Sequence, residues 1–174
     1  MSEYIVSIVG EDRPGIVAAV TGALLQADGN VEDCRASILA GSFAMVLAVQ
    51  VPDRVTEREI TDLLAPTAAG LGLSLGVRAA GPAHTDPGGD RCVVTIYGAD
   101  RPGIVHGAAS ALAAAGVNIV DLSSRLVGTP PIYVLGIEAE VPSGMPVSAV
   151  ESAMNCPDLA GLDVSVQAES ERLL

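Results

Sequence analysis

The sequence predicts an α+β chain of two similar βαββαβ domains, each an antiparallel four-stranded sheet with two helices on one face. Two observations lead to this prediction. Residues 10–33 and 98–121 are identical at 12 of 24 positions, at an offset of 88 residues. Residues 81–90 contain three glycines and two prolines, a composition typical of a linker. We therefore expect a first domain over 1–80, a linker over 81–90, a second domain over 91–168 and a polar tail over 169–174.

The first half of each copy is predicted from local patterns. A strand is expected at 3–9, where β-branched residues are frequent. Pro14 suits the opening of a helix, and apolar residues then recur with helical spacing up to Ala27. Asp28-Gly29-Asn30 is a typical C-terminal helix signal. Residues 31–40 and 43–51 predict a hairpin that turns near Gly41-Ser42.

The second half adds a helix and a strand. Thr56-Glu-Arg-Glu59 has the pattern of a capping box, and Val55 and Ile60 are placed for a hydrophobic staple. The helix is expected to run to about Leu71, and a fourth strand follows over 73–77. The second copy repeats this plan, with a second capping box at Ser148-Ala-Val-Glu151. This order of elements is the ferredoxin-like arrangement.

The two copies differ in length within their hairpins. From Arg35 onward the best pairing uses an offset of 90, which matches Arg35 with Arg125 and Phe43 with Tyr133. We therefore expect a two-residue insertion just after Asp121, within the strand. An insertion of two residues would leave the two faces of that strand unchanged.

Charge and composition exclude several classes of function. The chain has 21 acidic and 9 basic residues, a net charge of −12, and every cation is arginine. Direct nucleic-acid binding is not expected, because nonspecific affinity depends on neutralising phosphates. The charge-free stretch 102–120 is rich in alanine and glycine, so we expect a core segment and no membrane span.

Cysteine usage and size point to a small cytoplasmic protein that self-associates. Cys34, Cys92 and Cys156 are odd in number and widely spaced, so we expect reduced core thiols. The N-terminus lacks the basic region of a signal peptide. Two Ala-rich units of this size would gain from further burial, and we expect a homodimer.

Candidate ligand-binding residues lie in the segment Asp12-Arg13-Pro14-Gly15 and in its repeat. They stand where a strand ends and a helix begins, and free N–H groups at such a place attract anions. Asp12 and Asp100 could cap the helix or offer a carboxylate to an ammonium group. The asparagines at the next strand start carry both a donor and an acceptor. The residues alone allow either a zwitterion site or a purely structural turn.

The repeated GxDRPGIV segment, the Ala/Leu-rich helix and the Asn that opens the next strand resemble the ACT domain, a small regulatory amino-acid-binding module. Two copies resemble the tandem ACT proteins of the glycine-cleavage-system repressor type. This resemblance implies a ligand between two side-by-side copies, bounded by the loop after strand one and the start of strand two. The implied ligand-binding residues are Gly10, Glu11, Asp12, Pro14, Gly15, Asn30, Val31, Gly98, Ala99, Asp100, Pro102, Gly103, Asn118 and Ile119.

Three further polar side chains, His106, Arg13 and Arg101, lie in or next to the repeated segment. His106 has Ala18 as its counterpart, and we expect it on a helix surface or an interface, with a place at the ligand site as the alternative. Arg13 and Arg101 are expected to form ion pairs with neighbouring acidic residues, although either could meet a ligand carboxylate.

The motifs of catalysis and of cofactor binding are missing from the sequence. It has no GxSxG, phosphate loop, zinc motif or Cys–His pair, so we expect no enzyme, no metal and no cofactor. The third strands lack the basic and aromatic residues of RNA-binding modules. Two interpretations stay open: a sensor of an amino acid or similar small zwitterion that acts on a partner protein, or a ligand-free interaction and dimerisation module.

Overall fold

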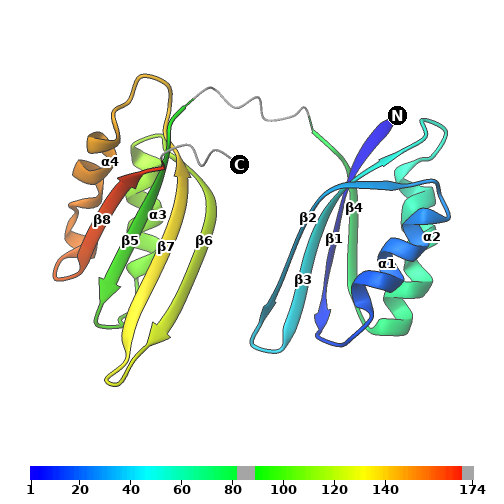
Figure 1. Cartoon of the computed structure of the whole chain (residues 1–174), viewed down its shortest axis with the longest axis horizontal. Helices are drawn as coiled ribbons and strands as arrows, with labels where there is room; N and C mark the ends of the chain where they lie inside the picture. Colours follow the sequence, from blue (N-terminus) through cyan, green and yellow to red (C-terminus); the bar gives the residue numbers. More distant parts are fainter. Residues whose placement is uncertain (82–88, 170–174) are drawn as a thin grey trace. The chain divides into compact units, whose positions relative to one another are not determined.

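The computed structural model describes residues 1–81 and 89–169, and the chain divides into two compact units, Met1–His84 and Thr85–Leu174 (Figure 1). The first unit contains β1 (Ser2–Glu11), α1 (Ile16–Leu25), β2 (Asn30–Leu39), β3 (Ser42–Val51), α2 (Glu57–Leu71) and β4 (Ser74–Ala79). The second contains β5 (Arg91–Gly98), α3 (Ile104–Ala114), β6 (Asn118–Val127), β7 (Ile132–Glu140), α4 (Val147–Met154), a short 3-10 helix η1 (Pro157–Leu159) and β8 (Asp163–Ala168). The predicted βαββαβ order is confirmed in both units. Most of the expected linker and nearly all of the expected tail lie outside the described residues.

Each unit is a four-stranded antiparallel sheet with both helices on one face (Figure 1). The strand order is β2-β3-β1-β4 in the first unit and β6-β7-β5-β8 in the second. Strands β2 and β6 therefore lie at a sheet edge, and only the central strands have partners on both sides. Within the described ranges, no helix has both the length and the hydropathy of a membrane span.

The core of each unit lies between sheet and helices. Alternate residues of the central strands, such as Val6 and Ile8 in β1, are almost fully buried against Leu24 and Ile60 from the helices. The second unit has an equivalent cluster around Ile96 in β5. Each fully buried side chain of this size contributes roughly 1.5–3 kcal/mol. The cores use aliphatic side chains almost throughout, as the scarcity of aromatic residues predicts.

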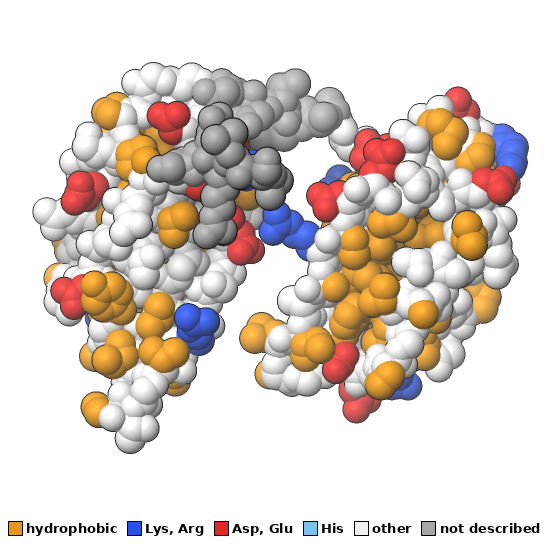
Figure 2. Space-filling view, in the orientation of Figure 1, with side chains coloured by type: hydrophobic (Ala, Val, Ile, Leu, Met, Phe, Trp, Pro, Cys, Tyr) orange, Lys and Arg blue, Asp and Glu red, His pale blue; other side chains and the backbone are white. Residues whose placement is uncertain are grey.

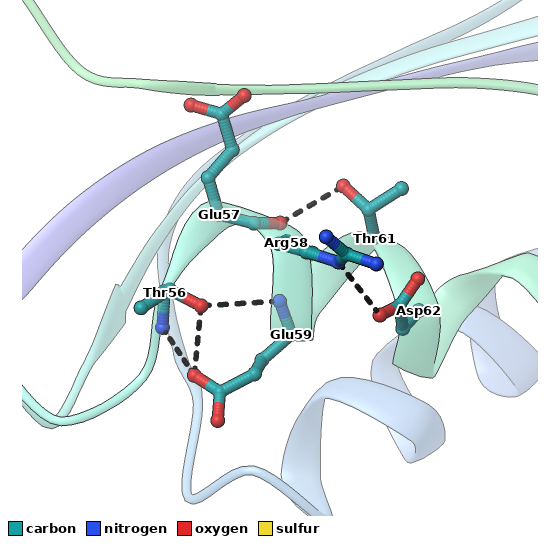
Figure 3. Close-up of polar contacts among 6 residues, drawn as sticks. All are labelled: Thr56, Glu57, Arg58, Glu59, Thr61 and Asp62. Carbon is teal, nitrogen blue, oxygen red and sulfur yellow. Dashed lines mark hydrogen bonds and ion pairs between the residues drawn. The ribbon is translucent and has the colours of Figure 1, made fainter.

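Helix α2 begins with the predicted capping box (Figure 3). The Thr56 hydroxyl accepts from the Glu59 N–H at 3.3 Å, and the Glu59 carboxylate accepts from the Thr56 N–H at 2.7 Å. The Thr56 hydroxyl also donates to the Glu59 carboxylate at 2.8 Å. The two hydrogen bonds that this carboxylate accepts from Thr56 lower the pKa of Glu59, the one from the backbone N–H most strongly. Pro66 is accommodated inside the helix, which runs to Leu71 as expected.

The second predicted capping box is wrong. Helix α4 starts at Val147, and its N-cap is Pro146, which makes no side-chain capping hydrogen bond. The carbonyl of Pro146 accepts from the Ala149 N–H at 2.8 Å, so the first turn closes ahead of the expected cap. Pro146 has the φ of −72° that its ring imposes, which starts the helix upstream and places Ser148 inside it.

The insertion that distinguishes the copies lies in the hairpin turn, and its expected position in the strand is wrong. Arg35 stands opposite Val46, whereas Arg125 stands opposite Val134, so the two arginines are not equivalent. The offset stays at 88 along the whole of β2 and β6. The two extra residues enlarge the turn, which spans 40–41 in the first unit and 128–131 in the second. Turns tolerate insertions because their residues are free of the sheet's hydrogen-bond ladder.

Two local expectations also need correction. Helix α1 ends at Leu25, two residues early, and Asp28 then takes a left-handed conformation with φ of 55°. Cys92 is buried as expected and Cys156 is half-buried, but Cys34 is exposed. Cys34 lies on edge strand β2, beyond the cover of the helices, so it is not a core thiol.

Candidate functional site

The repeated loops before α1 and α3 share one geometry. Strand β1 ends at Glu11, and Gly15 precedes α1 with φ of 95°; its counterpart Gly103 has φ of 97°. The Asp12 N–H donates to the Gly41 carbonyl at 3.0 Å, which ties this loop to the β2–β3 turn. A left-handed conformation is easily adopted only by glycine, which explains the glycine in both loops.

The two aspartates do not cap the helices, so that expected alternative is wrong. The N-cap positions are Gly15 and Gly103, and neither helix has a side-chain capping hydrogen bond. Asp12 and Asp100 lie three residues before these glycines and are exposed. Within residues 1–81 and 89–169, neither carboxylate has a hydrogen bond or ion pair. Both carboxylates are therefore available to a ligand.

The two motif arginines differ in their contacts. Arg13 lies 3.6 Å from the Glu11 carboxylate, which confirms the expected ion pair. Arg101 donates instead to two backbone carbonyls, of Asp158 at 2.7 Å and of Ala160 at 3.2 Å. The expected ion pair of Arg101 is therefore wrong, because the guanidinium instead binds one carbonyl within η1 and one just after it. This contact ties the β5–α3 loop to the segment before β8.

Gly10 and Gly98 have a packing role. A Cβ on Gly10 would lie 2.6 Å from Leu73 Cδ2, and one on Gly98 would lie 2.6 Å from Leu162 Cδ2. Each glycine allows the segment before the last strand of its unit to pack against the first strand. Glu11, Pro14, Ala99 and Pro102 are exposed, and Val31 and Ile119 pack half-buried against the cores.

The expected site has two halves, the loop after the first strand and the start of the second strand, and these lie at opposite ends of each sheet. Asn30 of β2 pairs with Gln50 of β3, and Gln50 also pairs with Glu3 at the start of β1. The loop at Asp12 follows Glu11, eight residues farther along the same strand, which is about 26 Å away at strand spacing. Asn118 has the same relation to Asp100 in the second unit. A single unit therefore does not bring the predicted residues together.

A surface pocket of about 470 Å³ lies beside the start of α3. It joins two predicted residues, Asp100 and Gly103, to six that were not predicted as ligand-binding. Its lining consists of Asp100, Arg101, Gly103, Ile104, Val105, His106, Ala109 and Tyr133. Tyr133 was missed, although its alignment with Phe43 marked an aromatic position at the start of the third strand. A larger pocket of about 790 Å³, formed by α4, η1 and the start of β8, contains none of the predicted residues.

Exposed large hydrophobic side chains recur at the same positions in both units. Val9, Val17, Ile38 and Leu39 of the first unit correspond at an offset of 88 to Tyr97, Val105, Leu126 and Val127 of the second. All lie toward the end of the unit that carries the loop before α1 or α3. Figure 2 shows hydrophobic side chains gathered on the surface of the first unit. The described residues contain no group of three or more His, Cys, Asp or Glu side chains that could hold a metal ion.

Comparisons with known proteins agree with this architecture. A family model described as "ACT domain" matches residues 3–78 and 90–167. A UPF0237 protein of Methanopyrus kandleri is 38% identical over 53 residues, which are 30% of this chain and 59% of that protein. A UPF0237 protein of Methanococcus maripaludis is 39% identical over 51 residues, 29% of this chain and 57% of that protein. The chain thus spans little more than half the length of these curated relatives.

Two solved structures resemble the chain over nearly its whole length. An unknown protein from Galdieria sulphuraria is 26% identical, with a TM-score of 0.82 over 97% of this chain and 99% of that one. A "putative glycine cleavage system transcriptional repressor" is 19% identical, with a TM-score of 0.71 over 96% of each chain, and it shows the fold. The family model covers most of the chain in two successive matches. The chain therefore belongs to the ACT-domain family and carries two ACT domains in tandem.

Proposed function

We propose that this protein is a regulatory protein that binds an amino acid or similar small zwitterion between two ACT domains and acts on a partner protein. ACT domains are regulatory modules, and this chain carries two of them. The ligand would act by favouring one arrangement of the domains over another, in proportion to its difference in affinity for the two. No catalytic step is part of this proposal.

The observation that carries the proposal is the separation of the two site halves within each sheet. The loop at Asp12 and the strand start at Asn30 lie at opposite ends of one unit. Two units placed side by side with β2 and β6 antiparallel would bring the loop of each beside the strand start of the other. Each composite site would then hold one aspartate without a partner and one asparagine.

The exposed hydrophobic positions support the same pairing. Ile38 lies on the edge strand β2 and Val17 in the first turn of α1, and Leu126 and Val105 repeat these positions in the second unit. A surface that recurs in two similar units suits an isologous contact, in which the same patch meets its copy. The pairing could join the two domains of one chain or of two chains. We propose a homodimer because it would cover more of this surface.

The first experiment is a thermal-shift screen against the twenty amino acids. A ligand at 100 times its dissociation constant adds about 2.7 kcal/mol of stability. We expect a selective shift, and we expect Asp12→Ala and Asp100→Ala to weaken binding about tenfold to a hundredfold, as loss of a charged hydrogen bond does. Asp62→Ala, on the exposed side of α2, is the matched control and should bind normally.

The structure makes the aspartate variants a clean test, because neither side chain caps a helix. Their unfolding free energies should change by less than about 0.5 kcal/mol, as for other exposed positions. Unchanged affinity in both variants would refute the assigned role of the aspartates.

The second candidate function is a ligand-free interaction module, and the repeated exposed hydrophobic positions favour it independently. A panel of amino acids without any shift would refute the sensor proposal and support this alternative. Val17→Asp combined with Val105→Asp should then abolish self-association in analytical ultracentrifugation.

A further inference from the structure

The two domains are unequal at the loop before their first helix. In the second domain the lining of the surface pocket includes Asp100, His106 and Tyr133, whose side chains carry a carboxylate, an imidazole and a phenol hydroxyl. The first domain has Ala18 in place of His106 and Phe43 in place of Tyr133. Both replacements remove a hydrogen-bonding group and keep an apolar one. The difference therefore changes the hydrogen bonds that a ligand can make at each loop more than it changes the fold.

Asp100, His106 and Tyr133 are the polar side chains of this pocket that differ from Arg101 in their contacts. Across the described ranges, none of them takes part in a hydrogen bond or ion pair. Tyr133 is half-buried and packs against the second core, which restrains its side chain beside the pocket. Asp100 and His106 are exposed. A polar group held in this way is available to a bound molecule.

The pocket has the size and mixed lining of a small-molecule site. Its volume of about 470 Å³ lies within the usual range of roughly 300–1,000 Å³. Ile104, Val105 and Ala109 supply apolar surface beside the polar groups. A neutral imidazole has one donor and one acceptor, and a phenol hydroxyl can both donate and accept. Their natural complement is a hydroxyl or a carboxamide, which also donates and accepts.

We propose that the second domain sets the specificity of the protein, and that His106 and Tyr133 recognise the side chain of a neutral polar amino acid. This inference rests on the proposed function, in which Asp100 binds the ammonium group. The amino acid then carries a hydroxyl or carboxamide side chain, and glycine and alanine bind more weakly. The first domain, with Ala18 and Phe43, makes no such distinction.

The test is isothermal titration of the full chain with serine, threonine, asparagine and glutamine, and with alanine and glycine as ligands that lack the polar side chain. At least one polar amino acid should bind about tenfold more tightly than alanine. Tyr133→Phe should weaken that ligand about fivefold to tenfold, the usual effect of one lost neutral hydrogen bond, and leave alanine unchanged. His106→Ala should act in the same direction.

Two matched controls separate recognition from folding. Tyr133→Phe installs the residue that the first domain already has, so the domain should fold normally. Ser165→Ala removes a hydroxyl from β8 of the same sheet, outside the pocket, and should change no affinity. Its effect should differ clearly from that of Tyr133→Phe.

The outcomes distinguish failure of this inference from failure of the proposed function on which it rests. Absence of binding by all twenty amino acids would refute the proposed function and this inference together. Binding that does not favour a polar side chain, or that Tyr133→Phe and His106→Ala leave unchanged, would overturn the inference and leave the proposed function standing.

Discussion

Replacing Gly15 by alanine should destabilise the first domain. Gly15 precedes α1 with φ of +95°, and an added Cβ would meet no atom within 4 Å. The cost therefore comes from the backbone conformation alone and not from a steric clash. A left-handed conformation costs a residue with a Cβ roughly 1–2 kcal/mol.

The same substitution at Gly22 should have the opposite sign. Gly22 lies within α1, has ordinary helical backbone, and also has open space at its Cβ. Alanine is favoured over glycine in a helix interior by roughly 0.5–1 kcal/mol. The two alanine variants should thus differ by about 2 kcal/mol, although the chemical change is identical.

Urea unfolding of the full chain, followed by far-UV circular dichroism, measures both changes. For a domain of this size, 1 kcal/mol corresponds to a melting shift of about 4–8 °C, so thermal melting gives a second readout. If Gly15→Ala were neutral or stabilising while Gly22→Ala behaved as expected, the left-handed conformation assigned to this loop would be refuted.

The remaining predictions concern the capping box and the thiols. Thr56→Ala should destabilise the first domain by about 1 kcal/mol, whereas Ser148→Ala should stay within about 0.5 kcal/mol in urea unfolding, because only Thr56 caps its helix. Since the pKa of Glu59 is lowered below its ordinary 4.5, the stability from this contact is present above that pH and lost as the pH falls through the lowered value. The penalty of Thr56→Ala should therefore shrink in acid, and an equal penalty at pH 7 and pH 3 would contradict this account. In the native protein, Cys34 should react with a thiol reagent at once and Cys92 only on unfolding, because Cys34 is exposed and burial raises the pKa of Cys92. Peptide mapping after labelling checks this order, and early labelling of Cys92 would contradict it.

Local signals in the sequence predicted most of the elements correctly. The periodicity around Ile16 and the capping box at Thr56 depend on residues within one or two turns, and both helices appear where expected. The same reasoning was wrong at Ser148, where the neighbouring Pro146 starts the helix earlier. A capping pattern indicates a local preference, and the fixed φ of a proline two residues away can override it.

The candidate site was only half predictable. The repeated loops marked Asp12 and Asp100, and the structure leaves both carboxylates without a partner among the described residues. Tyr133 could not be assigned to the same pocket as Asp100 from the sequence, because it lies on β7, more than thirty residues farther along the chain. Similarly, the exposure of Cys34 depends on how far the helices reach over the sheet.

The sequence by itself determined that this protein consists of two copies of one unit, what secondary structure each copy forms, and which loop is repeated. These properties follow from residue order and short-range periodicity. Only the tertiary structure decided that the extra residues lie in a turn, that Asn30 and Asp12 stand at opposite ends of a sheet, and that His106 and Tyr133 share a pocket. Each of these depends on the register between strands distant in sequence. That register is set by the packing of a whole sheet against its helices, which no local pattern contains.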